Sequence, residues 1–353
     1  MTAASITING VMIGPGKPVF VIAEAGSNHN GNREMALDLI NAAAQAGADA
    51  VKFQTFTARR LYPRSAGTSD YLGIPTPIFD IMEELEMPVD WLPSLRDRAH
   101  ELGLAFISSP FHEAAVDVLE PYVDAFKVAS YELTHTPLLS AVASTGRPVI
   151  LSTGAATLDE VRGAVTHLER SGCEEMIVLQ CTAAYPTPLE AANVRAVATL
   201  ATELGVLTGL SDHTRDPTAA PMAATALGAV AIEKHFTLSN ALPGPDHGFA
   251  VEPEELSRLV SAVRRTEAVL GSGRKIVDQV EEELRHFARR SIFATRPIRK
   301  GERFTRDNVD VLRHGRLAAG LPPEFLPRVL VSYAARDVDA ERSLQADDLT
   351  AQS

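Results

Sequence analysis

A unit made of a short apolar run and a following amphipathic stretch repeats along most of the chain. The amphipathic stretches include Arg33–Ala46 and Leu158–Arg170, and several end at glycine, where a left-handed helix cap meets no steric penalty. The apolar runs are Val19–Ala25, Ala50–Phe56, Ala105–Ser109, Ala125–Ser130, Pro148–Thr153, Met176–Thr182, Val206–Asp212 and Ala229–Phe236. Eight βα units in about 270 residues favour a (β/α)8 TIM barrel over a doubly wound sheet.

The pattern changes towards both ends of the chain. A Gly-Pro-Gly turn at Gly14–Gly16 predicts a small hairpin before the first core strand. After a barrel domain at 1–273, the charged stretch 274–290 is expected to be a linker, and 291–353 contains short strand-like runs typical of a small β-rich domain. The long connection 57–86 follows the second strand, and long loops at that end of a barrel commonly form lids or binding loops.

Composition excludes several classes of protein. The net charge of −12 argues against a nucleic-acid surface, which needs a basic patch. Cys173 and Cys181 are the two cysteines and form no CxxC pair, so neither a disulfide framework nor a zinc site is expected. The longest apolar stretch, Ala219–Ile232, is too short to span a bilayer and contains Pro221. Without a basic, apolar N-terminal signal, we expect a cytoplasmic protein.

Polar side chains end every predicted strand, and in a (β/α)8 barrel that end holds the active site. They are Glu24, Lys52, Gln54, Ser109, Lys127, Ser130, Ser152, Thr153, Gln180, Thr182, Ser211, His213, Glu233 and His235. Alternation along the last strand places Glu233 and His235 on one face and Lys234 on the other. One such residue is commonplace, but a complete ring with two lysines and two histidines is hard to explain by packing alone.

These residue types suggest an anion and a divalent metal. Lys52 and Lys127, together with hydroxyl groups, suit a phosphate or a carboxylate. His213 and His235 suit Mn, Zn, Co or Fe better than Ca, although two histidines by themselves are more often satisfied polar residues at strand ends. Two protein ligands would leave positions open to water and substrate. Glu24, among lysines, is expected to stay ionised and to act as a general base.

Several segments closely resemble the sialic acid synthase family, and the resemblance covers nearly the whole chain. It is nearest the subgroup of spore-coat polysaccharide synthases, with which the chain shares Ala129–Glu132. Residues 291–353 resemble the antifreeze-like (SAF) C-terminal domain of that family. The matching segments are Ile22–Gly31, Val51–Gln54, Phe126–Ser130, Leu151–Gly154, Tyr185–Pro188, Gly209–His213, Glu233–Thr237, Pro243–Asp246, Arg299–Glu302 and Val311–Arg313.

The resemblance implies that phosphoenolpyruvate condenses with the aldehyde of an N-acetylated hexosamine, giving a nine-carbon 2-keto acid and phosphate. Glu24 would be the acid/base group with Gln54 beside it, and His213 and His235 would hold Mn²⁺ or Mg²⁺, which polarises the aldehyde. The phosphoenolpyruvate would be held by Lys52, Ser109, Lys127, Ser130, Ser152 and Ser211. The sugar would contact Tyr185, Asp246 and, from the other subunit of a homodimer with exchanged C-terminal domains, Arg313.

The chain departs from that family at several positions. Ala183 stands where relatives that make the common sialic acid have an asparagine that contacts phosphoenolpyruvate, and Ser109 replaces a threonine. Around Gly73–Thr76 no counterpart of a sugar-binding asparagine is found. These changes leave the sugar open, and a di-N-acetylated 6-deoxy sugar is one candidate. Two alternatives remain: a phosphoenolpyruvate aldol synthase that makes seven- or eight-carbon keto acids, and a catalytically silent barrel that binds sugar or phosphoenolpyruvate.

Overall fold

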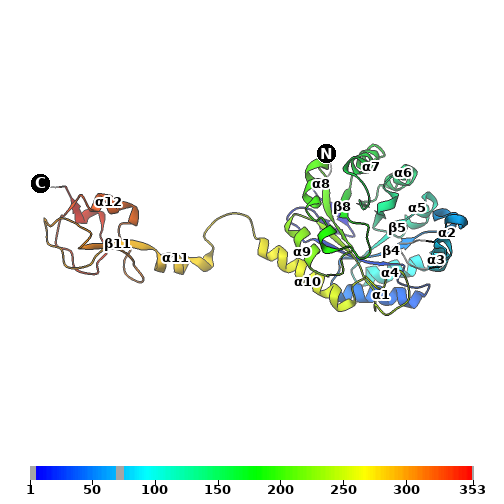
Figure 1. Cartoon of the computed structure of the whole chain (residues 1–353), viewed down its shortest axis with the longest axis horizontal. Coiled ribbons are helices and arrows are strands. Elements are labelled where there is room, and N and C mark those ends of the chain that lie inside the picture. The colour runs from blue at the N-terminus through cyan, green and yellow to red at the C-terminus, as the bar shows by residue number, and fades with distance from the viewer. Residues whose placement is uncertain (1–4, 69–74, 352–353) are drawn as a thin grey trace. The chain divides into compact units, whose positions relative to one another are not determined.

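The structure is a computed structural model that describes residues 5–68 and 75–351 (Figure 1). The chain divides into two compact units, Met1–Gly271 and Ser272–Ser353. Within the described residues, no helix is both long and apolar enough to cross a membrane.

The first unit is a closed parallel barrel, as the repeating units predicted. Its described residues contribute eight strands, which close in the order β10-β3-β4-β5-β6-β7-β8-β9. The strands are β3 (Phe20–Gly26), β4 (Ala50–Thr55), β5 (Ala105–Pro110), β6 (Ala125–Val128), β7 (Val149–Ser152), β8 (Met176–Cys181), β9 (Leu207–Asp212) and β10 (Ala231–His235). Each lies within about two residues of the apolar run that predicted it.

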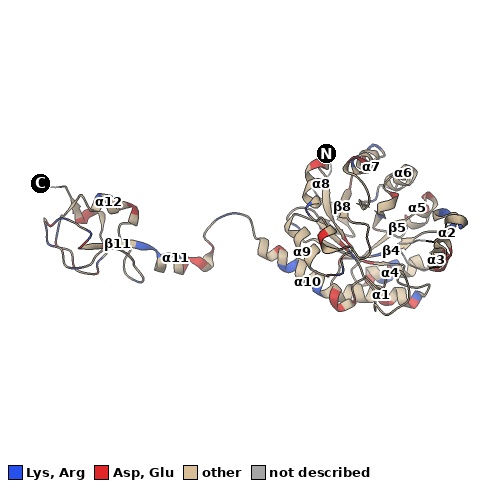
Figure 2. Ribbon diagram, viewed as in Figure 1, with Lys and Arg blue, Asp and Glu red and all other residues tan. Residues whose placement is uncertain are grey.

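Helices surround the barrel and carry its outer charged residues, as on α1 and α10 (Figure 2). Asn32 caps α1 by accepting hydrogen bonds from the next turn, and Gly47 ends that helix with a φ of 83°. The helices that follow the strands are α1 (Arg33–Ala46), α4 (Leu92–Glu101), α5 (Glu113–Leu119), α6 (Thr136–Ser144), α7 (Leu158–Arg170), α8 (Ala196–Leu204), α9 (Ala219–Ala226) and α10 (Pro253–Leu270).

The N-terminal hairpin differs from the prediction. It pairs β1 (Ile6–Ile8) with β2 (Val11–Ile13), and its turn is Asn9-Gly10 rather than Gly14–Gly16. Both turn residues have positive φ, 45° and 77°, which a two-residue hairpin turn of the right twist requires and which Asn-Gly tolerates best. The buried isoleucines of this hairpin pack with residues from the strand starts, including Phe20.

The connection 57–86 after β4 is partly helical. It contains α2 (Ala58–Leu61) and α3 (Ile78–Leu85), which pack side by side at the edge of the barrel (Figure 1). Phe79 anchors α3 in the interior with 2% of its surface exposed. The segment is therefore an ordered wall beside the strand ends wherever the structure describes it.

Alternation along the strands sorts apolar from polar side chains. Leu210 of β9 and Ile232 of β10 face outwards and pack with Ala220, Ala224 and Leu259 of the covering helices. Their neighbours in sequence therefore face the barrel interior. At the strand ends, the side chains that face the barrel interior include the polar ones predicted from the sequence.

The second unit is the small β-rich domain expected from 291–353. Helix α11 (Glu282–Ala288) precedes an antiparallel pair, β11 (Arg290–Ala294) and β12 (Val309–Arg313). Helix α12 (Leu326–Val329) and a second short pair, β13 (Tyr333–Ala334) with β14 (Leu349–Thr350), complete it. Ile292, Phe304 and Leu344 lie in its own hydrophobic core.

Candidate active site

Two lysines and two glutamates meet inside the barrel, and we call Glu24, Lys52, Lys127 and Glu233 the inner ionic cluster. Lys52 Nζ lies 2.8 Å from Glu24 Oε2 and 3.7 Å from Glu233 Oε1. Lys127 Nζ lies 3.8 Å from the same oxygen of Glu233. No member exposes more than 3% of its surface. Burying four charged groups is unfavourable unless they are paired, so this cluster indicates a site rather than packing.

Each lysine also contacts a serine of the neighbouring strand. Lys52 Nζ donates to Ser109 Oγ at 3.3 Å, and Lys127 Nζ donates to Ser152 Oγ at 2.7 Å. Ser211 Oγ donates to Glu233 Oε1 at 3.3 Å. These three serines and both lysines therefore lie together, as an anion-binding site requires.

Ser130 is held differently from the other predicted serines. Strand β6 ends at Val128, and Ser130 begins a short 3₁₀ turn instead of ending the strand. Its Oγ accepts a hydrogen bond from Gly154 N at 2.9 Å and lies 3.5 Å from Cys181 Sγ. The hydroxyl group still joins the strand-end ring, through the turn that follows β6.

The two glutamates of the inner ionic cluster have opposite pKa shifts. Burial raises the pKa of Glu24, and the ion pair with Lys52 only partly offsets that effect. Burial acts in the same direction on Glu233, but Lys127 and Lys52 outweigh it and lower its pKa. Glu233 is thus the fixed anion and Glu24 the group suited to carry a proton. The direction of this shift was not foreseen, because complete burial of Glu24 was not evident from the sequence.

Glu24, Gln54 and Asp246 meet around Gly26. Gln54 Nε2 donates to Glu24 Oε1 at 2.8 Å. Gly26 has a φ of 55°, and a Cβ there would lie 3.3 Å from Glu24 Oε1 and 3.6 Å from Asp246 Oδ2. A side chain at this position would therefore press on both carboxyl groups, and glycine leaves them room.

His213 and His235 lie next to each other, with ring centroids 5.2 Å apart. His213 Nδ1 lies 3.0 Å from the carbonyl oxygen of Thr182, so this nitrogen is the donor and Nε2 keeps its lone pair. His235 Nδ1 is buried without a hydrogen-bond partner, and the nearest carboxylate oxygen, of Asp246, is 3.6 Å away. The described residues form no cluster of three or more His, Cys, Asp or Glu placed around a metal. Two adjacent imidazoles fit a metal whose other ligands come from substrate and water.

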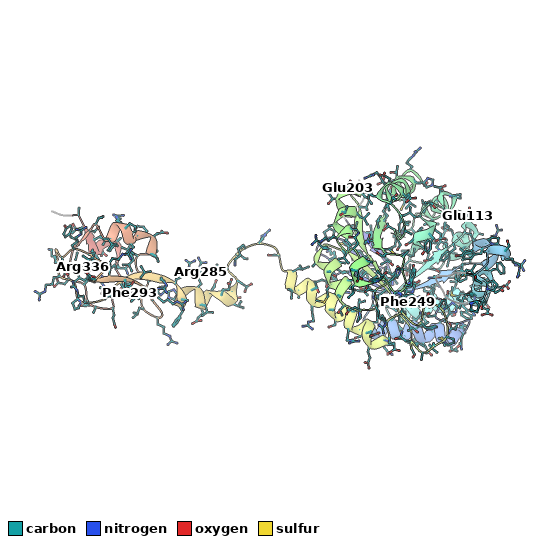
Figure 3. The ribbon with its side chains drawn as sticks, viewed as in Figure 1. Glu113, Glu203, Phe249, Arg285, Phe293 and Arg336 are labelled. Carbon is teal, nitrogen blue, oxygen red and sulfur yellow. The ribbon has the colours of Figure 1, made fainter. Side chains whose placement is uncertain are left out.

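A pocket of about 600 Å³ opens above these groups. Tyr185 stacks 4.2 Å from His213 and 5.3 Å from Phe249, measured between ring centroids. Phe249 lies towards the middle of the barrel, while Glu113 lies at its periphery (Figure 3). Further residues that line the pocket are Ser27, Gln54, Phe56, Leu61, Tyr62, Ala66, Thr68, Ile78, Met82, Leu85, Phe111, Ala129, Tyr131, Glu132, His235, Pro245 and Asp246. Tyr185 and Asp246, predicted to contact sugar, therefore share one pocket with His235.

Sequence reasoning missed three residues of this site. Glu132 lines the pocket, and its buried Oε2 has no hydrogen-bond partner. Burial raises the pKa of Glu132 to about 7. Glu233 had been placed on the face of His235 but was given no role. Cys181 had no predicted role, and its buried Sγ lies 3.8 Å from His213 Nδ1. Ala129–Glu132 was noted only as a family motif.

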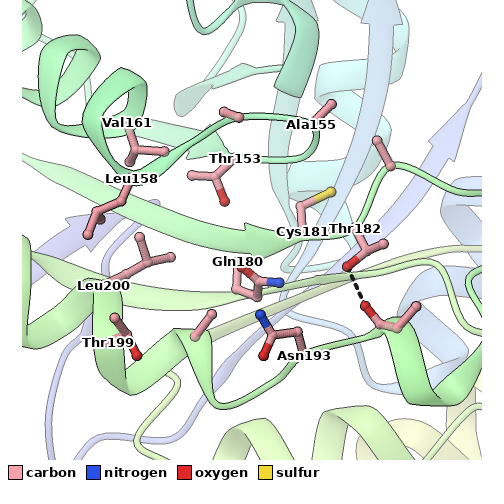
Figure 4. A pocket seen from close by; sticks show the side chains of 14 residues that line it. Thr153, Ala155, Leu158, Val161, Gln180, Cys181, Thr182, Asn193, Thr199 and Leu200 are labelled. Carbon is pink, nitrogen blue, oxygen red and sulfur yellow. Dashed lines mark hydrogen bonds between the residues drawn. The ribbon is translucent and has the colours of Figure 1, made fainter.

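A second cavity, of about 490 Å³, lies between α7 and α8 (Figure 4). Gln180, Thr182 and Ala183 line it, and Thr182 Oγ1 donates to the Ala191 carbonyl at 2.8 Å. Cys181 lines it as well and contacts Ser130, so this cavity adjoins the inner site. Ala183, which stands where some relatives have an asparagine, therefore lies in the wall of this second cavity.

Two predicted positions lie elsewhere. Arg313 ends β12 in the second unit, opposite Arg290 and exposed. Basic residues also stand at the start of β11 (Figure 2). Of the Gly73–Thr76 region, Gly73 and Ile74 lie outside the described residues.

Comparison with known proteins shows the family of this chain. Residues 39–275 match the NeuB family, and residues 289–350 match the SAF domain. The spore coat polysaccharide biosynthesis protein SpsE of Bacillus subtilis is 41% identical over 98% of this chain and 97% of its own length. Its crystal structure superposes with a TM-score of 0.67, at 40% identity over 99% of this chain and all of that one.

Two named synthases are also similar. The N,N'-diacetyllegionaminic acid synthase of Legionella pneumophila is 36% identical over 96% of both chains. The pseudaminic acid synthase of Campylobacter jejuni is 35% identical over 94% of this chain and 97% of its own. Such matches cover the barrel and the C-terminal domain together, and the chain therefore belongs to the NeuB family of sialic acid synthases, with a SAF domain at its C-terminus.

Proposed function

We propose that this protein condenses phosphoenolpyruvate with the open-chain aldehyde of an N-acylated hexosamine, releasing phosphate and a nine-carbon 2-keto acid. The observation that carries the proposal is the inner ionic cluster, in which two buried lysines each contact a serine. A pocket lined by His235 adjoins it, and His213 lies beside His235. The legionaminic and pseudaminic acid synthases among its relatives support a product of this class.

Lys52, Lys127 and the serines beside them would hold the phosphate and carboxylate of phosphoenolpyruvate. Their fixed donors need no rearrangement when the anion enters, which is the main advantage of a preformed electrostatic site. Ser109, Ser130, Ser152 and Ser211 provide the neutral donors. Glu233, paired with both lysines, keeps them oriented.

The reaction joins C3 of phosphoenolpyruvate to the aldehyde carbon. The aldehyde oxygen takes up a proton, water adds to C2 and gives up a proton, and the C2–O bond to phosphate then breaks. Glu132, with a pKa of about 7, can hold a proton near neutral pH and give or take it in these steps, and Glu24, whose pKa burial also raises, is the second acid/base candidate. Gln54 fixes the Glu24 carboxyl group through its 2.8 Å hydrogen bond.

His213 and His235 would hold a divalent metal, Mn²⁺ or Mg²⁺. When bound, such an ion supplies a Lewis acid that polarises the aldehyde oxygen. Asp246, whose pKa burial raises to about 6, lies beside His235 and would contact the sugar together with Tyr185.

The pocket favours a free sugar over a sugar phosphate. None of its described lining residues is Lys or Arg, and the undescribed stretch 69–74 contains neither type in its sequence. Its wall beside α2 and α3 is hydrocarbon, from Leu61, Ile78 and Met82. A phosphate against this apolar wall would lose its hydration without gaining a cation from the wall itself, whereas methyl and acetyl groups would be accommodated there. A di-N-acetylated 6-deoxy hexose fits this wall best.

We further propose a homodimer with exchanged C-terminal domains, in which Arg313 reaches the sugar site of the other subunit. Val280, Leu284 and Phe287 support this proposal, because they share one face of the α11 segment and are 84%, 61% and 43% exposed. An apolar helix face of this kind is typical of an interface.

The test is phosphate release from phosphoenolpyruvate with Mn²⁺ and a panel of sugars. The panel holds N-acetylmannosamine, two di-N-acetylated 6-deoxy hexosamines, and arabinose 5-phosphate. We expect release with a free amino sugar, highest for a 6-deoxy one, and loss of release on chelation and in His235→Ala. Preference for arabinose 5-phosphate would favour the aldol synthase alternative. Phosphoenolpyruvate binding without turnover on any sugar would favour the silent barrel.

A further inference from the structure

Lys234 is a buried charged residue that the proposed reaction does not use. It stands between Glu233 and His235 on β10 but faces the opposite side of the barrel wall, and only 1% of its surface is exposed. Asp212 of β9 lies directly beside it in register. We call Lys234 and Asp212 the outer ion pair.

The donors of Lys234 are fully used. Its Nζ lies 2.6 Å from Asp212 Oδ2, donates to the carbonyl oxygen of Thr214, and lies 3.1 Å from that of Asp216. Asp212 in turn accepts from Thr214 N at 2.9 Å and from Thr214 Oγ1 at 3.1 Å. The ammonium group therefore fixes the backbone of the loop that follows β9.

That loop carries His213. The carbonyl oxygen of His213 accepts a hydrogen bond from Thr187 N at 2.9 Å, which also ties in the segment that contains Tyr185. Lys234 is the neighbour of His235 in sequence. The side chain next to His235 thus binds the carboxylate of the residue before His213 and the backbone of the residues after it.

We propose that Lys234 is a positioning residue that sets the placement of His213 relative to His235, and through it the affinity of the pair for a divalent metal. The inference rests on the metal site of the proposed function. Two ligands on separate strands bind one ion well only if both keep their distance and orientation, and loss of an outer partner commonly weakens metal binding about 10–100-fold.

Packing alone gives no reason for a lysine here. A buried ion pair can often be replaced by apolar residues of similar volume without loss of stability. An apolar side chain, however, would leave the carbonyl groups of Thr214 and Asp216 without this donor. The ammonium group therefore holds the backbone of the loop in place, which an apolar side chain of similar volume could not do.

The test separates stability from metal binding by comparing Lys234→Met with Asp212→Leu/Lys234→Met. Mn²⁺ is titrated into the metal-free full chain and followed by electron paramagnetic resonance, and thermal unfolding is recorded. We expect Lys234→Met to lower both Tm and Mn²⁺ affinity. We expect the double variant to recover much of the Tm while its Mn²⁺ affinity stays about 10–100-fold below that of the wild type.

Arg264→Met is the matched control. Arg264 pairs with Asp49 at 2.8 Å, and Asp49 precedes β4 at the opposite end of the barrel from the histidines. This variant is expected to lower Tm and to leave Mn²⁺ affinity unchanged. If the methionine variants do not fold, the milder Asp212→Asn decides, with an expected Mn²⁺ affinity several-fold below that of the wild type.

Two outcomes overturn the inference in different ways. Wild-type Mn²⁺ affinity in the folded double variant, or in Asp212→Asn, would show that the outer ion pair only stabilises the fold, and would leave the proposed function intact. Absence of Mn²⁺ binding by the wild-type protein would overturn the metal site itself and this inference with it.

Discussion

The two sides of the barrel wall at β9 and β10 carry buried ionisable residues in opposite conditions. On the inside, Glu233 Oε2 and His235 Nδ1 are buried and have no hydrogen-bond partner. On the outside, Lys234 and Asp212 satisfy each other and the neighbouring loop. Unpaired buried groups are unfavourable, so they persist where a ligand completes them, whereas a fully paired group needs nothing more. Hydrogen-bond completeness therefore separates the reactive side of the barrel wall from the supporting side.

The same substitution on each side should have opposite consequences, and the largest effect on activity is expected inside. Lys127→Met removes a fixed donor for the substrate anion and should lower kcat/KM about 10²–10³-fold. The free energy of unfolding should fall by no more than about 1 kcal/mol, because Glu233 keeps Lys52 and Ser211 as partners. Steady-state kinetics and urea unfolding measure the two quantities. If Lys127→Met is too unstable to fold, so that its kcat/KM cannot be measured, the proposed contrast between the two sides is wrong.

Outside the barrel, Lys234→Met should act mainly on stability. Removing one partner of a fully buried pair leaves Asp212 and a carbonyl group unpaired, which costs about 3–5 kcal/mol. Urea unfolding of this variant beside Lys127→Met gives the comparison directly. Equal stability of the two variants would mean that hydrogen-bond completeness does not distinguish the two sides.

Glu132 adds a pH test of the inner side. Its folded pKa of about 7 lies above the ordinary 4.5, so the native state retains a proton that the unfolded chain loses. If Glu132 donates that proton, kcat/KM should fall as the pH rises through about 7. As the pH rises from about 4.5 to 7, the unfolded chain ionises at Glu132 while the native state keeps its proton, so stability should fall progressively over that range. Glu132→Gln should lower the rate about 10²-fold and remove this limb of the profile. An unchanged profile would exclude Glu132 as the donor.

The smallest expected effect concerns the C-terminal domain. Arg313→Ala and His235→Ala chains are mixed after denaturation and refolded together. In an exchanged dimer, the barrel of the first chain meets an intact Arg313 from the second, so a random mixture should recover about a quarter of wild-type activity. Each variant alone serves as control. Recovery no greater than the sum of the two separate activities would rule out the exchange.

The sequence specified the barrel because its strands and helices have distinct periods. The buried runs and the glycine caps fixed α1 and α7 to the residue. The strand-end ring followed from alternation, which correctly placed Glu233 and His235 together. The predicted position of the hairpin turn was wrong. Gly14–Gly16 resembled a turn as strongly as Asn9-Gly10 did, and only the pairing of Ile6 with Ile13 shows which of the two turns forms.

The pocket wall was beyond sequence reasoning for a different reason. Met82 reaches it from α3 and Phe111 from the loop after β5, and nothing in local sequence indicates that they meet. Glu132 was missed because burial, rather than residue type, raises its pKa. The roles of the site residues, of the metal and of the dimer remain predictions, each with its own test.

The most direct test of the central claim compares phosphate release from phosphoenolpyruvate with and without a free N-acylated hexosamine, using wild-type protein and Lys127→Met. We predict release that requires the sugar, equals the keto acid formed mole for mole, and is lost in Lys127→Met. Release without sugar, or none with any amino sugar while phosphoenolpyruvate still binds, would contradict the proposal that this barrel joins the two substrates.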